Sequence, residues 1–430
     1  MTPQMTSVLQ ALSCADDYDP NSLPVSLARD LILSLVEPIA GGERAFVRRG
    51  LNRVLAEDVI APMDVPAHDN SAMDGYALRH ADLAANGETR LKIAGSAYAG
   101  KAYEGTLNPG DALRIMTGAI IPPGLDSIVI QEVVRVEGDS VVIPPGQRPG
   151  QNFRHAGEDL KAGQPALTAG KLLRPAEIGL LASLGQVEVT LKRRLRVAMF
   201  STGDELAALG KPLLAGQVYD SNRYTLWGML ERLGCEVLDM GVVRDDPAAL
   251  EAALTEAAAS SDAIITSGGV SVGEADFIRE LMTRLGEVAF WKIAMKPGRP
   301  MAFGRIAGTG NCGDGAWLFG LPGNPVAVMV TFYQFVRPAL LKMMGAETAS
   351  LPSFRVTCST ALKKAPGRTE FVRGLLYQDN GEWRVRPTGA QGSGILRSMS
   401  DANCFIVLEH ERGNVAAGEM VSVQAMEGLV

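Results

Sequence analysis

The stretch Ser267 to Asp276, which reads SGGVSVGEAD, combines glycines and carboxylates in a pattern that could bind a phosphate. It follows a short β-branched apolar run, 263–266, and precedes a helix-like segment, 277–285, so we predict a strand-to-helix loop. Glycines let such a loop take positive φ and turn its N–H groups toward an oxyanion, and the helix start adds a favourable dipole end. The residues expected to contact the substrate here are Ser267, Gly268, Gly269, Ser271 and Gly273.

Two carboxylates, Glu274 and Asp276, stand at the end of this loop. Carboxylate oxygens beside an anion-binding loop suit a phosphate that carries Mg²⁺. The alternative is a tight turn with an acidic helix start, and the loop matches neither the Walker nor the dinucleotide fingerprint. The loop alone therefore leaves both interpretations open.

The segments around the loop alternate between strand and helix patterns, which predicts a doubly wound α/β domain. The strand patterns run from 195–200 to 288–294, and the helix patterns between them cover 221–233, 247–260 and 277–285. Such domains bind ligands outside the carboxyl ends of their strands. At those ends stand 201–204 with Glu205, Asp245 with Asp246, the glycine loop, and Lys292, Lys296 and Arg299. We expect them on one edge of the sheet, as a site for a phosphorylated ligand that bears a metal ion.

A further strand pattern begins at Trp317 and leads through LPGNP into an apolar helix that reaches about Met344. Pro325 suits the first position of that helix. The free N–H groups just inside the helix could meet an anion, or they could simply be capped. Both possibilities stay open.

The rest of the chain carries two β-rich regions and several short helix patterns. The helix patterns cover 26–36, 51–56 and 175–184, and β-branched runs fill 91–144. Strand patterns return from Phe354 onward and predict a small closed β domain. Asp74 lies in the irregular loop 62–78, where it either caps a strand or meets a ligand.

Composition excludes several classes of function. The 430 residues, 47% apolar and 21% charged, predict a soluble protein of about three domains. The net charge of −7 argues against a nucleic-acid binder. The first twenty-two residues hold three aspartates and no basic residue, so no secretory signal is predicted. The longest apolar stretch, Val326–Val336, is too short to span a membrane, and we expect a cytoplasmic protein.

The cysteines and histidines point away from zinc and from a Ser-His-Asp triad. The five cysteines form no CxxC pair, and the four histidines show no metal-ligand spacing. Catalysis would therefore rest on carboxylates, cations and backbone groups.

A series of ordered motifs resembles the molybdopterin molybdenumtransferase family, which includes MoeA and the E domain of gephyrin. The resemblance covers about Val25 to Val423. The motifs, in order, are DNSAMDGYA, RIMTGA, GEDL, FSTGDEL, YDSNR, RDDP, SGGVSVGEADF, KPGRP and LPGNP. Two departures are Arg299, where a lysine is usual, and a longer loop between Arg305 and Trp317.

The resemblance implies a transferase that inserts molybdate into adenylylated molybdopterin, with Mg²⁺ present and AMP released. It implies a homodimer whose active cleft is shared between subunits, and a separate adenylyltransferase is a possible partner. The implied catalytic positions are Asp74, Thr117, Asp159, Glu205, Asp245, Asp276, Lys292 and Lys296. Glu205 and Asp276 would hold the metal, and Arg373 and Ser393 would contact the substrate.

The resemblance also implies four domains. They are an elongated one (23–63 and 158–192), an inserted β-rich one (64–157), a MogA-like α/β domain (193–347) and a C-terminal β domain (348–430). Two other functions stay open: a molybdopterin adenylyltransferase, which would not need the two β domains, and a scaffold that binds the pterin without turnover.

Overall fold

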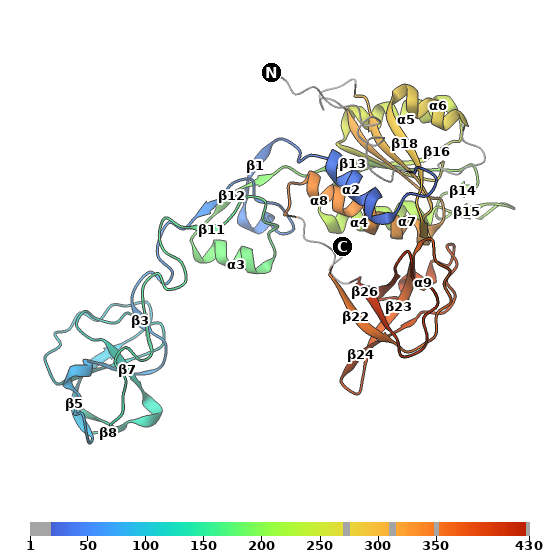
Figure 1. Cartoon of the computed structure of the whole chain (residues 1–430). Helices are drawn as coiled ribbons and strands as arrows, with labels where there is room; N and C mark the ends of the chain where they lie inside the picture. The colour runs from blue at the N-terminus through green and yellow to red at the C-terminus, as the bar shows by residue number, and fades with distance from the viewer. Residues whose placement is uncertain (1–18, 270–275, 309–314, 348–351, 427–430) are drawn as a thin grey trace.

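The computed structural model describes residues 19–269, 276–308, 315–347 and 352–426. The chain is elongated (Figure 1). An α/β sheet and a β-barrel lie together at one end, and a separate β lobe lies at the other. A narrow middle part connects them.

The α/β part is built on a six-stranded sheet with the order β16-β13-β17-β21-β20-β18. All strands run parallel except β20, which is antiparallel to both neighbours. Their bounds are Glu236–Val243, Arg196–Thr202, Ala263–Ser267, Ala316–Leu321, Pro300–Ile306 and Gly286–Lys292, in sheet order. The α/β prediction is confirmed, whereas β20 was not expected. Because β20 runs the opposite way, β18 again ends at the edge where the parallel strands end.

Helices cover both faces of this sheet, as Figure 1 shows. On one face α5 (Pro247–Ser260) and α6 (Asp276–Leu285) bury apolar residues against the strands. On the other face lie α2 (Val25–Leu35), α4 (Ser221–Leu233), α7 (Pro325–Thr331) and α8 (Arg337–Met343). The start of α4 is fixed by Asp220, whose carboxylate accepts from Arg223 N–H. Asp246 caps α5 in the same way, which explains why sequence patterns located both helices.

The segment from Pro325 to Met343 is continuously helical, with a π-helical part, η4 (Phe332–Val336), between α7 and α8. It extends beyond the apolar stretch seen in the sequence. Among the described residues it is the helix whose length and composition would suffice to cross a membrane. However, 78% of its apolar window is buried inside the protein, as expected for a core helix.

The C-terminal strands close into a small barrel, as expected. The sequence of neighbours is β23-β24-β22-β26-β25, and β25 pairs again with β23. The bounds are Thr369–Asp379, Glu382–Pro387, Ser353–Cys358, Met420–Ala425 and Cys404–Leu408, and a short helix, α9 (Arg397–Ser400), precedes β25. A short strand from the α/β part, β19 (Met295–Lys296), pairs in parallel with β23. This pairing joins the barrel to the carboxyl edge of the sheet.

The middle part pairs segments that are far apart in the sequence. Its strands are β1 (Gly42–Phe46) with β12 (Glu188–Lys192) and β2 (Val59–Ile60) with β11 (Pro165–Leu167), packed near α3 (Pro175–Ser183). The helix expected over 51–56 is wrong. Asn52 takes a φ of 58°, and Val54 and Leu55 form bridges to Leu172 and Leu191. Pairing with distant backbone overrides the local helical pattern there.

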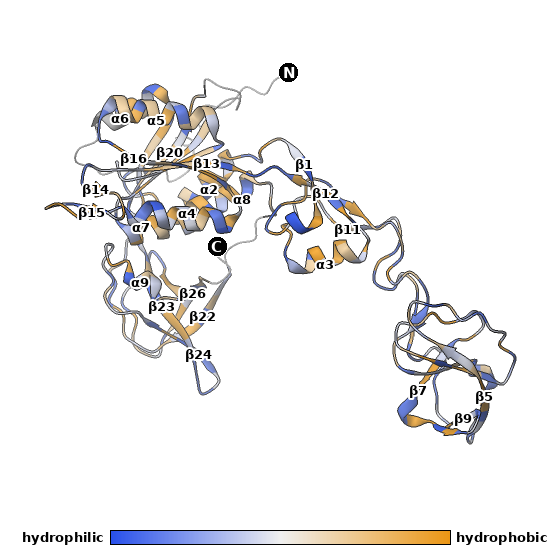
Figure 2. Cartoon of the chain, turned by 180° about the vertical axis from the view of Figure 1, so that it is seen from behind, coloured by the Kyte–Doolittle hydropathy of each residue, from blue (hydrophilic) through white to orange (hydrophobic). Residues whose placement is uncertain are grey.

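The distal lobe contains a six-stranded sheet with the order β7-β4-β6-β5-β9-β8. These strands span Ser127–Ile130, Gly75–Leu78, Asp111–Ile115, Thr89–Ala97, Ser140–Ile143 and Arg135–Glu137. A small pair, β3 (Asn70–Ser71) with β10 (Phe153–Arg154), lies where the chain enters and leaves the lobe. At the opposite end of the molecule, β14 (Leu206–Ala207) and β15 (Val218–Tyr219) form an arm that projects from the α/β part (Figure 2).

Candidate functional site

A cleft of about 1080 Å³ lies at the carboxyl edge of the α/β sheet, where the barrel meets it. Its walls come from the ends of β13, β17 and β21, from the segment after β19, and from two segments of the barrel. Strand ends in parallel sheets are the usual place for ligand sites. The strand-end residues expected on one edge are therefore largely brought together, although Asp246 and Lys292 do not line the cleft.

One wall of the cleft is acidic. Asp204 and Glu205 follow β13, and Asp245 follows β16. The Glu205 carboxylate folds back over Gly203, so that a Cβ on this glycine would lie 2.7 Å from both Glu205 oxygens. Gly203 has a φ of 146° and no side chain, and this leaves room for the carboxylate.

The facing wall is basic and comes from the seam between β19 and the barrel. Lys296, Arg299 and Arg368 all line the cleft. The buried carboxylate of Glu370 pairs with two of them: it lies 3.6 Å from Lys296 Nζ and 3.0 Å from Arg368 Nε. The cleft therefore presents carboxylates on one side and cations on the other.

The glycine loop forms the floor between these walls. Ser267, Gly268 and Gly269 line the cleft, and the two glycines have φ values of 93° and 69°. Ser271, Gly273 and Glu274 lie outside the described residues. Asp276 begins α6, but its side chain is also outside the described part. The predicted positive φ at the start of the loop is confirmed.

Asn222, which sequence reasoning did not select, ties the floor together. Its Nδ2 donates to Ser267 Oγ at 2.8 Å and to Gly323 O at 2.6 Å, and thereby joins the ends of β17 and β21. Its Oδ1 is buried without a hydrogen-bond partner in the described structure, as is the Oγ1 of Thr202 in the same cleft. The motif YDSNR contained a signal for this residue. It places a polar side chain in the first turn of a helix that faces a strand-end loop.

Gly268→Ala is expected to destabilise the protein by roughly 1–3 kcal/mol. The added Cβ would lie 2.6 Å from the backbone oxygen of Thr202, and the φ of 93° already disfavours a side chain. Urea unfolding measures the change. Gly323→Ala is the matched control, because its Cβ would approach no atom closer than 3.9 Å. Equal losses in both variants would contradict this account.

The barrel contributes a loop to the cleft, and its lining residues are Gln391, Gly392 and Ser393. Ser393 O accepts from Val326 N–H at 3.1 Å, so this N–H at the start of α7 is capped by the barrel. Arg373 does not line the cleft; its side chain is buried and donates to Ser398 Oγ and Gly392 O, both at 3.0 Å. Burial lowers the pKa of Arg373 to about 10. In this structure Arg373 supports the loop that presents Ser393.

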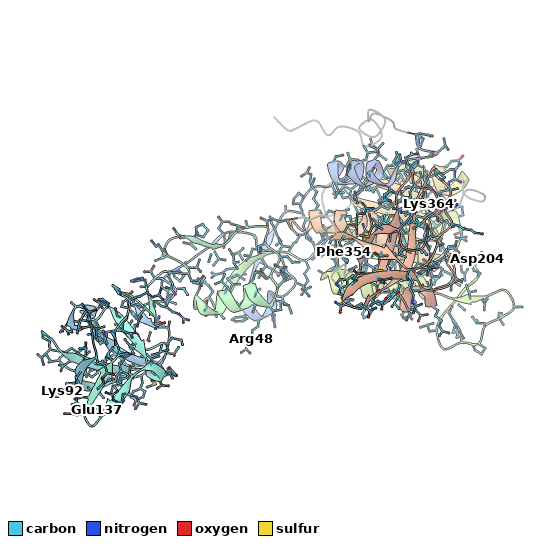
Figure 3. All side chains as sticks on the ribbon, turned by 60° about the horizontal axis from the view of Figure 1, so that its bottom comes forward. Arg48, Lys92, Glu137, Asp204, Phe354 and Lys364 are labelled. Carbon is cyan, nitrogen blue, oxygen red and sulfur yellow. The ribbon has the colours of Figure 1, made fainter. Side chains whose placement is uncertain are left out.

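Three predicted residues lie in the distal lobe or beside it, away from the cleft. Asp74 and Thr117 are joined there, since Asp74 Oδ1 accepts from Thr117 N–H at 2.7 Å and from its hydroxyl at 2.8 Å. Asp159 is exposed near the base of the lobe, where its N–H donates to Val65 O. Figure 3 shows how far this lobe, marked by Lys92 and Glu137, lies from Asp204 beside the cleft.

Lys292, at the end of β18, is half-buried and is not part of the cleft lining.

Thr117→Val is expected to raise the pKa of Asp74. The backbone N–H of Thr117 and then its hydroxyl hold that pKa below the ordinary value of 3.8, and valine keeps only the first. Because the pKa of Asp74 is lower in the folded protein than in the unfolded chain, its hydrogen bonds to Thr117 stabilise the fold at pH values above the ordinary pKa. This stabilisation is lost as the pH falls through the pKa of the folded protein. An NMR titration of the Asp74 carboxyl measures the shift. An unchanged pKa would contradict the role of the hydroxyl.

The donors in the acidic wall suit Mg²⁺, because they are carboxylate oxygens without histidine or cysteine beside them. Within the part of the chain that the structure describes, no three such side chains group as a metal site. The proposed pair of Glu205 and Asp276 stays a prediction, since only Glu205 is described with its side chain.

Comparisons with known proteins agree along most of the chain. Family models match three successive regions: the MoeA N-terminal region, domains I and II, at 23–185; a probable molybdopterin binding domain at 198–342; and the MoeA C-terminal region, domain IV, at 355–426. A curated molybdopterin molybdenumtransferase of Haemophilus influenzae is 46% identical over 411 residues, which are 95% of this chain and 100% of that protein. A molybdopterin molybdenumtransferase 2 of Mycobacterium tuberculosis is 38% identical over 86% of this chain and 91% of its own length.

A solved structure shares the fold. The molybdopterin biosynthesis MoeA protein of Pyrococcus horikoshii superposes with a TM-score of 0.78 and 29% identity, over 94% of this chain and 100% of that one. The chain therefore belongs to the MoeA family of molybdopterin molybdenumtransferases.

Proposed function

We propose that this transferase inserts molybdate into adenylylated molybdopterin, in a reaction that depends on Mg²⁺, hydrolyses the adenylate and releases AMP. The observation that carries the proposal is the cleft with one acidic and one basic wall. A pyrophosphate that must be cleaved and a dianionic oxyanion that must be held require both charges within one site.

The residues of the cleft have distinct tasks in this proposal. Glu205, with Asp276, would hold Mg²⁺, which supplies charge neutralisation on the phosphates. Backbone N–H groups of the glycine loop would orient the phosphates. Water attacks one phosphorus atom, and the P–O bond that links the two phosphates breaks. AMP is released, and the oxygen from water stays on AMP or on the phosphate of the pterin. Lys296 and Ser393 would hold molybdate beside the pterin.

The barrel helps to distinguish this function from an adenylyltransferase. An adenylyltransferase would need only the α/β domain, yet here the barrel supplies Arg368, Gln391 and Ser393 to the cleft. We further propose the domain limits given by the resemblance and a homodimer in which the distal lobe of one subunit completes the cleft of the other. A separate adenylyltransferase would supply the adenylylated pterin.

Incubation with adenylylated molybdopterin, Mg²⁺ and molybdate tests the proposal, with AMP release as the measurement. We expect release that molybdate stimulates, that sulfate does not, and that falls when Mg²⁺ is omitted. Pterin binding without stimulated release would favour the scaffold instead.

A further inference from the structure

Two Pro-Gly-Arg turns each place an arginine at the cleft, one from each side of the seam between the α/β part and the barrel. Residues 297–299 follow β19, and residues 366–368 precede β23. Their glycines, Gly298 and Gly367, have nearly equal φ values of 99° and 97°. Both turns end in an arginine that lines the cleft. The resemblance drew attention to the first turn, whereas nothing in the sequence analysis selected the second.

Arg368 is anchored by one edge of its guanidinium group. Its Nε donates to Glu370 Oε1 at 3.0 Å, while the side chain stays 46% exposed. No hydrogen bond joins its two Nη atoms to another described residue. A guanidinium held through Nε keeps the planar pair of donors that matches two oxygens of a tetrahedral oxyanion.

Glu370 holds a second cation as well. Its Oε2 lies 3.6 Å from Lys296 Nζ, and Lys296 and Glu370 are register partners in the β19–β23 pairing. Only 6% of the Glu370 side chain is exposed, and a buried carboxylate is tolerated when cations pair with it. Without this carboxylate, long cationic side chains that are half exposed would be drawn toward the acidic wall opposite.

The charges of this wall suit a dianion. Lys296, Arg299 and Arg368 carry three positive charges above the single negative charge of Glu370, which leaves a net charge of +2. Molybdate has the complementary charge. The phosphate of the adenylylated pterin offers the same tetrahedral oxygens.

We propose that Arg368 is a further binding residue for a tetrahedral oxyanion, and that Glu370 is the positioning residue that holds Arg368 and Lys296 on the basic wall. The inference rests on the proposed function. It adds two residues of the barrel that the sequence motifs did not assign.

Arg368→Gln is expected to raise the KM for molybdate by about 10-fold or more in the AMP-release assay, with a smaller effect on kcat. Arg386→Gln is the matched control, because Arg386 is exposed on β24 of the same barrel and does not line the cleft. If the KM for adenylylated molybdopterin rises instead, the oxyanion is the pterin phosphate. If neither KM moves relative to the control, the inference is wrong.

Glu370→Gln tests the positioning role separately. Glutamine keeps an oxygen acceptor of the same shape but loses the charge that retains both cations. We expect a KM increase of about 3-fold or more in the wild-type background and a smaller increase when Arg368→Gln is already present, since only the effect through Lys296 then remains. Tighter oxyanion binding in Glu370→Gln would show that the carboxylate merely competes with the anion. Additive effects would likewise overturn the positioning role.

Direct titration of the protein with molybdate separates this inference from the proposed function. The wild-type protein could show a saturable heat of molybdate binding, lost in Arg368→Gln, without molybdate-stimulated AMP release. That result would contradict the proposed function and support the oxyanion site. Conversely, both proteins could show stimulated AMP release, with the same molybdate affinity and the same two KM values in Arg368→Gln as in the wild type. That result would support the proposed function and contradict the oxyanion site.

Discussion

Glu205→Gln is expected to lower molybdate-dependent AMP release by about 10²-fold or more, because one oriented charge in a catalytic cleft typically contributes that much. The carboxylate follows β13 directly and folds over Gly203 into the cleft. Glutamine keeps the size of the side chain, so the midpoint of thermal unfolding should stay nearly unchanged. Initial rates at saturating Mg²⁺, together with a thermal melt, measure both quantities.

The matched control is Glu236→Gln, at the start of β16 and therefore at the opposite end of the sheet. Its 3.4 Å ion pair with Arg196 is exposed and should contribute little to stability. Asp276→Asn should resemble Glu205→Gln if both carboxylates hold the metal. If Glu205→Gln instead lowered the melting midpoint and kept its specific activity, Glu205 would be a structural residue.

The α/β part could be predicted from sequence because its signals are local. Asp220 and Asp246 cap α4 and α5, and Pro247 occupies the first turn of α5, so both helices begin where the pattern indicates. The strand β20 was missed because its neighbours β18 and β21 decide its direction, and no local pattern encodes an antiparallel strand in a mostly parallel sheet. The segment 51–56 failed for the same reason: its partners, Leu172 and Leu191, lie more than a hundred residues away.

The acidic wall of the site could be predicted for a similar reason, since each of its residues directly follows a strand of one sheet. The basic wall could be predicted only in part. Lys296 and Arg299 belong to the α/β part, but Arg368 and Glu370 reach them through the β19–β23 pairing, which no pattern within either segment specifies. Asn222 was missed because its two hydrogen-bond acceptors, Ser267 and Gly323, lie 45 and 101 residues away in the sequence.

A mixture of Asp74→Ala and Glu205→Ala proteins is expected to recover activity that neither protein shows alone. Asp74 belongs to the distal lobe and Glu205 to the cleft at the other end of the molecule (Figure 1). One chain therefore cannot bring the two residues together in this conformation. If both serve one reaction, a second subunit must supply Asp74.

A twofold dimer makes the expected recovery quantitative. In a mixed dimer one cleft receives both changes and the other receives neither. Random exchange makes about half of the dimers mixed, each with one intact site of two, so about a quarter of wild-type activity should return. Exchange must be verified independently, for example by mass spectrometry of differently tagged subunits. Verified exchange without recovered activity would mean that the two residues do not meet across a dimer, and Asp74 would then serve the distal lobe through its bonds to Thr117.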